Sequence, residues 1–204
     1  MMGGSPLARI ARGGADALRE FLPGTPPPVA APRQPPGKTQ ALAPAAVLLP
    51  IIARAEPSVL FTRRCAHLTR HAGQICFPGG RAEPDDASPV ETALRETREE
   101  TGIDPALVAI AGFLDRHDTG TGYAIQPVVG WVTPDFTLVP QAREVDAIFE
   151  VPLAFLLDPA NVQEHRGSTP SGLRHYYSFT YQGQRIWGAT AAMMINFGAR
   201  LRAW

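Results

Sequence analysis

Arg95-Glu96-Thr97-Arg98-Glu99-Glu100-Thr101-Gly102-Ile103, preceded at a distance by Gly79-Gly80, is the most informative part of this chain. A proline at position 89 suits the first turn of a helix, because it has no N–H to lose and its φ is preset. Gly102 can adopt the left-handed conformation that ends a helix. Between them, side chains recur at spacings of three and four and predict one buried stripe: Val90, Ala93, Leu94, Thr97 and Thr101. The pattern therefore predicts a helix from Pro89 to Thr101.

Three carboxylates lie on another side of this helix. Glu96, Glu99 and Glu100 are spaced i, i+3 and i+4, which brings their side chains together. Like charges at these spacings repel, so the arrangement is best explained by a cation that lies among them. A hard divalent ion such as Mg²⁺ or Mn²⁺ prefers oxygen ligands and often shares them with substrate phosphates. The alternative is an exposed acidic face without chemistry, which is the usual role of such residues.

The glycine pair and the helix together resemble the Nudix box, a Gly followed by a loop and then Arg-Glu-apolar-x-Glu-Glu-x-Gly-apolar. The resemblance implies an α+β fold, with an α/β/α sandwich around a mixed sheet. It also implies that Glu96, Glu99, Glu100 and the Gly80 carbonyl bind metal, with Glu96 a candidate acceptor of the water proton. A glycine suits position 80, since the main chain must approach the ion closely.

Two positions depart from the family pattern. Thr97 takes the place of an apolar residue, and the loop between Gly80 and Arg95 is one residue longer. The longer loop leaves the carboxylate partner of Arg95 open among Asp86, Asp85 and Glu83. We expect Arg95 to orient one of these, or Glu99, through a bidentate pair.

A second pattern is more specific. The residues that carry it are Leu60-Phe61-Thr62-Arg63-Arg64, then Leu68, His71, Gly73 and Ile75, then Phe77-Pro78-Gly79-Gly80. They resemble the signature that precedes the Nudix box in the coenzyme A pyrophosphatase branch, as do Glu144-Val145 and Ile186-Trp187-Gly188-Ala189-Thr190. The resemblance covers about residues 46 to 204. It implies hydrolysis of coenzyme A, or its thioesters, to 3′,5′-ADP and 4′-phosphopantetheine with Mg²⁺ or Mn²⁺.

Several further side chains are candidates for the same site. Arg63, Arg64, Arg70 and His71 are candidate ligands of the phosphates, since arginine matches phosphate geometry well. Glu144 is a candidate base or metal ligand, and a surface glutamate is the equal alternative. Tyr123 and Trp187 could stack on adenine, although for Trp187 we expect a place in the core.

Two other functions stay open. Other Nudix enzymes cleave ADP-ribose or dinucleoside polyphosphates, and they do not require the His71-x-Gly73 segment. A non-catalytic Nudix domain that binds a nucleotide would be expected to lose carboxylates of the box, and here all three are present.

Composition limits the partners. The 204 residues carry 19 basic and 19 acidic side chains, so no bulk charge favours nucleic acid or a membrane. Two cysteines, Cys65 and Cys76, in a chain of this size favour a reduced, cytoplasmic protein. The start of the chain lacks the pattern of a signal peptide. A small-molecule substrate is the expected partner, and a homodimer is left open.

The remaining sequence predicts an arm and one domain. Residues 1–44 contain a helix between Pro6 and Leu22 and a proline-rich linker, for which we expect packing and no chemistry. Residues 45–204 form the domain. Strands are predicted at 46–53, 59–62, 74–77, 107–114, 125–132 and 146–151, a hairpin at 176–187 and helices at 153–157 and 189–201. A polar loop, 115–122, is expected over the site, and the order of elements fits a mixed sheet covered by helices.

Overall fold

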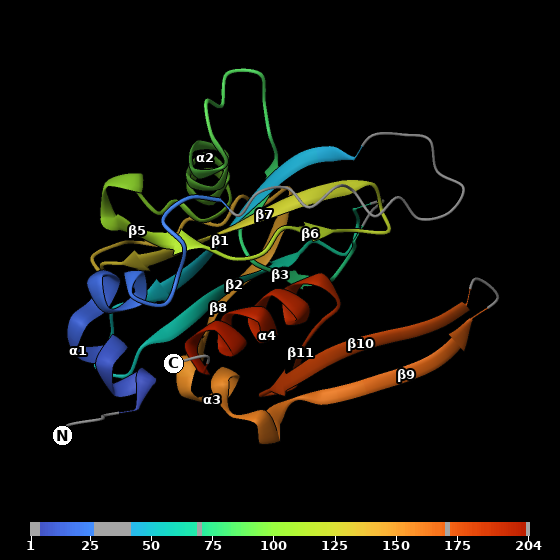
Figure 1. Ribbon diagram of the computed structural model, residues 1–204. Coiled ribbons are helices and arrows are strands. Elements are labelled where there is room, and N and C mark those ends of the chain that lie inside the picture. The colour runs from blue at the N-terminus through green and yellow to red at the C-terminus, as the bar shows by residue number, and fades with distance from the viewer. Residues whose placement is uncertain (1–4, 27–41, 69–70, 170–171, 203–204) are drawn as a thin grey trace.

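One mixed sheet forms the centre of the molecule (Figure 1). The computed structural model describes residues 5–26, 42–68, 71–169 and 172–202. The main path of the sheet runs β3-β2-β1-β7-β5, with β4 paired to β1, β6 to β7 and β8 to β2. Its strands are β1 (Ala43–Ile52), β2 (Ser58–Arg64), β3 (Ile75–Cys76), β4 (Gly79–Arg81), β5 (Val108–Phe113), β6 (His117–Asp118), β7 (Tyr123–Val132) and β8 (Val145–Pro152). The pair β1–β7 is parallel and the other pairs of this sheet are antiparallel.

Strand β1 divides the core into two layers. Side chains alternate across a strand, and Val47, Leu49 and Ile51 pack into the largest apolar cluster together with residues of α1, α3 and α4. Ala46 and Leu48 point the other way, into a cluster with Ala93 of helix α2. In Figure 1, α2 lies on one side of the sheet and α1 and α4 on the other. The expected α/β/α sandwich around a mixed sheet is therefore confirmed.

Helix α2 (Pro89–Thr101) begins and ends where the sequence predicts. The Ser88 hydroxyl accepts a hydrogen bond from Glu91 N at 3.3 Å, and Gly102 has a φ of 79°. These are the cap types that satisfy the free groups at the two helix ends. Thr97 is tolerated in the buried stripe because its hydroxyl donates to the Ala93 carbonyl at 2.6 Å. The stripe differs from the prediction, since Val90 and Leu94 are half-buried and Thr92 and Glu100 are buried.

The C-terminal part contains a second sheet, β11-β10-β9, and two helices. Their bounds are α3 (Leu153–Leu157), β9 (Gln163–Thr169), β10 (Gly172–Tyr181), β11 (Gln184–Trp187) and α4 (Ala189–Arg202). The hairpin β10–β11 and both helices were predicted. Strand β9 was not, because its sequence Gln-Glu-His-Arg-Gly-Ser-Thr has no apolar side chain and so no alternation of the kind that indicates a half-buried strand. It is held by pairing with β10 along its length.

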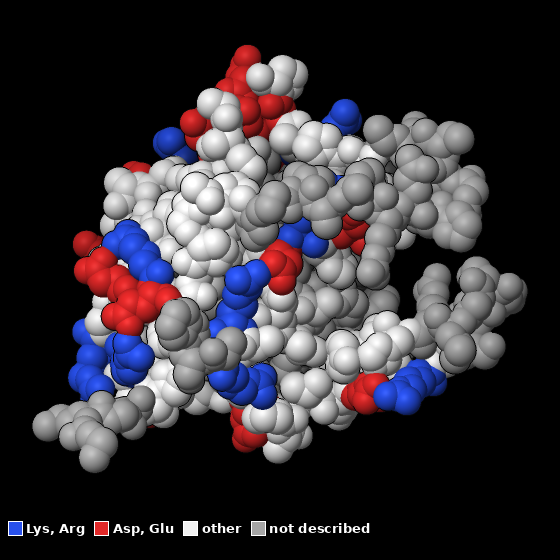
Figure 2. All heavy atoms as spheres, in the orientation of Figure 1, with Lys and Arg blue, Asp and Glu red and all other residues white. Residues whose placement is uncertain are grey.

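The N-terminal helix packs against the main apolar cluster. Helix α1 (Pro6–Arg19) places Ile10 and Leu18 in the main apolar cluster, and Phe21 and Leu22 follow them there. Most of the proline-rich linker, residues 27–41, lies outside the described residues. No helix in the described part of the chain is long and apolar enough to cross a membrane. On the face in Figure 2, acidic and basic side chains are interspersed, as the balanced composition would give.

Candidate active site

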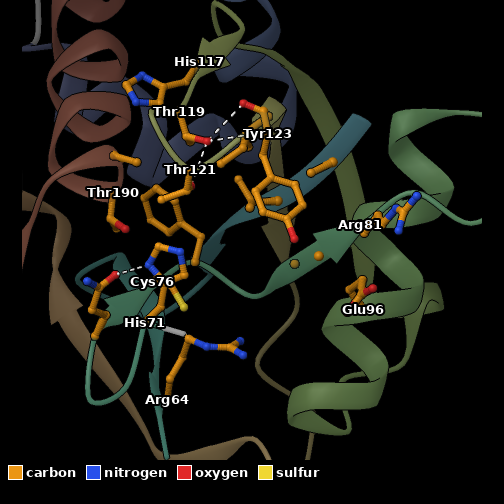
Figure 3. A pocket seen from close by; sticks show the side chains of 18 of the residues that line it. Arg64, His71, Cys76, Arg81, Glu96, His117, Thr119, Thr121, Tyr123 and Thr190 are labelled. Carbon is orange, nitrogen blue, oxygen red and sulfur yellow. Dashed lines mark hydrogen bonds between the residues drawn. The ribbon is translucent and has the colours of Figure 1, made fainter. Parts of the chain in front are cut away.

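A cavity of about 780 Å³ opens beside α2 and brings most of the predicted site residues together (Figure 3). Elements distant in sequence contribute to it: β4 and α2, the segment from β6 to β7, and the junction of β11 with α4. The predicted residues that line it are Arg64, His71, Gly80, Arg95, Glu96, Glu99, Glu100, Glu144, Tyr123 and Trp187. Residues of the helical box, the upstream signature and the later segments thus border one space.

The glycine turn packs directly against the acidic face of α2. A Cβ added to Gly80 would lie 2.5 Å from the carboxylate carbon of Glu96, so only glycine leaves this carboxylate in place. Glu100 is buried with a side chain 5% exposed, and it accepts a hydrogen bond from Gly79 N at 3.3 Å. Its other oxygen lies 3.8 Å from Nη1 of Arg64. The spacing of the box therefore presses two carboxylates against the main chain of the turn.

Burial controls the protonation of these carboxylates. Desolvation raises the pKa of Glu100 to about 8, opposed by the Gly79 N–H and reinforced by the nearby charge of Glu96. Desolvation also raises the pKa of Glu96, against the effect of Arg95. Glu144 adds negative charge to both. A carboxylate that is held in a place where its charge is unfavourable is a common feature of functional sites.

Arg95 links the carboxylates of the loop and the helix. Its Nε and Nη2 donate to the two oxygens of Asp86 at 3.1 and 3.0 Å, which lowers the pKa of Asp86 well below its usual range. Its Nη1 donates to Glu96 at 3.0 Å and to Glu99 at 3.4 Å. Of the three partners left open by the sequence, Asp86 makes the bidentate pair, and Glu83 lies 4.0 Å away. The extra loop residue does not remove the pair.

The donor set fits a hard divalent cation. Glu96, Glu99 and Glu100 supply oxygens, and the Gly80 main chain lies against them, which are the ligands that Mg²⁺, Mn²⁺ and Ca²⁺ accept. Among the described residues, no three acidic, histidine or cysteine side chains converge as a metal site as they stand. The guanidinium of Arg95 bridges Glu96 and Glu99 instead. These residues would hold the ion, and the desolvated charge of Glu100 is one that a cation would stabilise.

The metal-free protein should lose stability as the pH rises. The pKa of Glu100 is about 8 in the folded protein against an ordinary value of 4.5. A group whose pKa is raised by folding contributes its full stabilisation to the folded protein at pH values below its pKa in the unfolded chain. That contribution is lost as the pH rises through its pKa in the folded protein. We therefore expect the melting temperature of chelator-treated protein to fall between pH 5 and pH 8. Glu100→Gln should flatten this fall, measured by differential scanning fluorimetry, and an equal fall in the variant would contradict the assignment.

The candidate arginines differ in their position relative to the cavity. Arg63 and Arg64 are neighbours on β2 and point to opposite faces of the sheet. Arg64 lines the cavity, and its Nε is buried without a hydrogen-bond partner among the described residues. Arg63 instead pairs with Asp146 at 2.7 Å and is not among the residues that line the cavity. The structure thus separates Arg63 from the other candidates, and Arg70 lies outside the described residues.

The cavity also includes residues that the sequence did not single out. Among them are Arg81, Cys76, His117, Thr119, Thr121 and Met193. The polar segment 115–122 was expected near a site, and its residues 117–118 form β6. Trp187 corrects an expectation, because it is 39% exposed and lines the cavity where we predicted a core residue. The alternating pattern of β11 buries Ile186 and turns Trp187 outward.

Both cysteines are free thiols. Cys76 lines the cavity, where desolvation and the charge of Glu100 raise its pKa to about 11. A thiol with a raised pKa is a poor nucleophile at neutral pH. Cys76 is therefore not a candidate nucleophile of the site at neutral pH.

Comparisons with known proteins identify the family. The model of the NUDIX domain matches residues 42–171. An uncharacterized Nudix hydrolase, NudL, of Yersinia enterocolitica is 44% identical over 154 residues, which cover 74% of this chain and 77% of that protein. A NudL of Yersinia pestis is 42% identical over 154 residues, 74% and 75% of the two chains.

Solved structures with a similar fold include the MutT protein from Methanosarcina mazei, at 25% identity and a TM-score of 0.47, covering 59% of this chain and 83% of that one. A C. elegans Ap4A hydrolase in a binary complex has 18% identity and a TM-score of 0.47, over 54% and 80%. The extent of the family match and the identity to NudL carry the assignment, and the carboxylate helix beside the glycine turn agrees with it. This chain belongs to the Nudix family of hydrolases.

Proposed function

We propose that the protein hydrolyses the pyrophosphate bond of coenzyme A or its thioesters, with Mg²⁺ or Mn²⁺, to give 3′,5′-ADP and 4′-phosphopantetheine. The observation that carries the proposal is that residues of the upstream signature and of the helical box border the same cavity. Arg64, His71 and Gly80 come from the first, and Glu96 and Glu100 from the second. The volume of about 780 Å³ lies within the range of cavities that hold cofactor-sized ligands.

The roles follow from the contacts. Nudix hydrolases generally use divalent ions, and such an ion supplies charge neutralisation on phosphate oxygens and an activated water. Glu99 and Glu100 would hold it with the Gly80 carbonyl. Arg95 keeps Glu96 in position through its 3.0 Å contact. Glu96 and Glu144 are the two candidate acceptors of the water proton, since both lie at the cavity.

Cationic side chains would bind the phosphates. Arg64 and Arg81 line the cavity with half-buried or exposed side chains. His71 is held by a 2.8 Å contact between its Nδ1 and the side-chain oxygen of Gln74. The Arg64 side chain is partly exposed and its Nη1 lies 3.8 Å from Glu100, so its guanidinium can donate to a phosphate oxygen. These groups complement a substrate that carries several phosphate charges.

Chromatography of the products tests the proposal. Purified protein is incubated with coenzyme A, ADP-ribose or diadenosine polyphosphates, each with Mg²⁺ or Mn²⁺. The expected result is 3′,5′-ADP and 4′-phosphopantetheine from coenzyme A, with a higher kcat/KM than for the other substrates. Cleavage of ADP-ribose or diadenosine polyphosphates alone would overturn the proposal and assign another Nudix activity. Tight binding without cleavage of any substrate would indicate a nucleotide sensor.

A further inference from the structure

The cavity has two halves that differ in charge. One, which we call the charged half, contains the carboxylates of α2 with Glu144, Arg64, Arg81 and His71. The other, the neutral half, is lined by His117, Thr119, Thr121, Ile125, Trp187, Thr190 and Met193, and Tyr123 lies at the border of the two halves with its hydroxyl toward the side of Glu96 (Figure 3). Figure 3 shows Glu96 and Arg81 to one side, Arg64 and His71 below, and His117 and Thr119 at the end opposite to Arg64. No arginine or lysine lines the neutral half within the described part of the chain.

Hydrogen bonds fix the shape of the neutral half. The Thr119 hydroxyl accepts from Tyr123 N at 2.9 Å and from the Thr121 hydroxyl at 3.0 Å, and it donates to the Tyr123 carbonyl at 3.2 Å. Asp118 at its border is paired with Arg116 at 2.6 Å, so its charge is compensated. The turn between β6 and β7 is therefore a preformed wall.

Helix α4 forms the facing wall and is tied to the same segment. Asn196 donates to the carboxylate of Asp115 at 2.7 Å and accepts from Asp115 N at 3.2 Å. Arg200 pairs with the same carboxylate. At the start of the helix, the Thr190 hydroxyl donates to the Ile75 carbonyl at 3.2 Å. The distance between the two walls is thus set by contacts outside the carboxylate cluster.

Two polar groups, one in the neutral half and one at its border, are unused by the protein. The imidazole of His117 and the hydroxyl of Tyr123 make no hydrogen bond to any described residue. Burial lowers the pKa of His117, so the ring is neutral near pH 7 and can both donate and accept. Apolar surface from Ile125, Trp187 and Met193 lies around them. Such a surface suits a chain of amides and methylenes and offers no positive charge to an anion.

We propose that the neutral half binds the pantetheine arm of the substrate, with His117 and Tyr123 as hydrogen-bond partners of its amide and hydroxyl groups. The 3′,5′-ADP part then lies in the charged half, where Arg64, Arg81 and His71 are available to its phosphates. The reverse orientation would place a 3′-phosphate in a half without a cation from the described residues. This inference rests on the proposed function and adds the direction in which the substrate lies.

Binding of the two products tests the orientation separately from catalysis. 4′-Phosphopantetheine and 3′,5′-ADP are titrated in turn, with Mg²⁺, into the wild-type protein, Tyr123→Phe, His117→Ala and the double variant, with heat as the readout. A hydrogen bond contributes about 0.5–1.5 kcal/mol, or roughly 2- to 10-fold in Kd. We expect each single variant to weaken the binding of 4′-phosphopantetheine by that factor, and the double variant to weaken it by more. Binding of 3′,5′-ADP should stay within about twofold.

Matched controls are available on the second sheet. His175→Ala and Tyr177→Phe make the same chemical changes at residues that do not line the cavity, and neither should change the binding of either product. Tyr123→Phe removes only a hydroxyl without a partner, so it tests the proposal even if His117→Ala alters the fold, which circular dichroism would detect.

Each contrary result has a definite meaning. The proposed orientation would be overturned if the variants lost affinity for 3′,5′-ADP alone, lost affinity equally for both products, or lost none for either. Each of these results applies while coenzyme A is still hydrolysed. Absence of coenzyme A hydrolysis by the wild-type protein would instead refute the proposed function. The two failures are therefore distinguishable.

Discussion

Replacing Glu100 by glutamine should leave a folded protein whose turnover is lower by roughly 10²- to 10⁴-fold. The shape of the side chain is kept, and the amide oxygen can still accept from Gly79 N. What is lost is the anionic charge that we assign to metal binding. Glu99→Gln should have a similar effect on turnover. Steady-state assays over a range of Mn²⁺ concentrations measure both variants, and near-normal turnover would remove the residue from the site.

Although Glu100→Gln should lower turnover, it should not lower the thermal stability of the metal-free protein. In the wild-type protein without metal, the buried carboxylate of Glu100 is destabilising at pH 8, because its pKa is about 8 and its charge is desolvated. Glu100→Gln should therefore melt at the same temperature or higher under these conditions, while it gains less from added Mn²⁺. Glu56→Gln, an exposed glutamate in the β1–β2 turn, makes the same charge change away from the cavity. It should behave like the wild-type protein in both assays.

Replacing either glycine of the turn by alanine should have a different main effect: Gly79→Ala should lower stability, and Gly80→Ala should lower turnover. A Cβ on Gly79 would lie 2.4 Å from the Ala46 carbonyl oxygen and 2.5 Å from Val47 Cα, and the residue has a φ of 152°. The obstacle is main chain of β1, which cannot move without disturbing the sheet. We expect Gly79→Ala to cost about 3 kcal/mol or more and to lower the melting temperature by roughly 10 °C.

Gly80→Ala meets a different obstacle. Its Cβ would lie 2.5 Å from the carboxylate of Glu96, which is the end of a flexible side chain. The fold should therefore persist, with a melting temperature within a few degrees of the wild type. Turnover should fall by about 100-fold, since a carboxylate of the site is displaced. Gly167→Ala, where a Cβ meets nothing within 4 Å, is the control. Normal activity of Gly80→Ala would contradict the close packing of the turn on α2.

The sequence predicted the parts of the fold whose signals are local. Helix α2 carries its cap residue, its proline and its terminal glycine within a few positions, and its ends agree with the prediction. Most strands of the central sheet are apolar runs between turn residues, and the sequence predicted their positions as well. Strand β9 has no such signal, because it is stabilised by its pairing with β10 and not by burial.

The site was predictable as far as spacing determines which residues meet. The three carboxylates border one cavity because helical geometry fixes their offsets, and Glu144 borders it as well. Which of Arg63 and Arg64 faces the cavity depends on the register of β2 with β8, which shifts between these two residues. Position alone could not distinguish them. The loop 115–122 was expected over the site, but His117 and Thr121 were not singled out within it, because only the tertiary fold shows which of its side chains line the cavity.

The cavity is built by two groups of elements that share few contacts: α2 and β4 on one side, and the β6–β7 turn with α4 on the other. The residues for bond cleavage belong to the first group, and those we assign to arm recognition belong to the second. A change of preference among acyl chains could therefore arise by remodelling a short turn and one helix face, with the reaction centre left intact. Grafting of residues 117–123 from other family members would be a practical route to enzymes with altered selectivity.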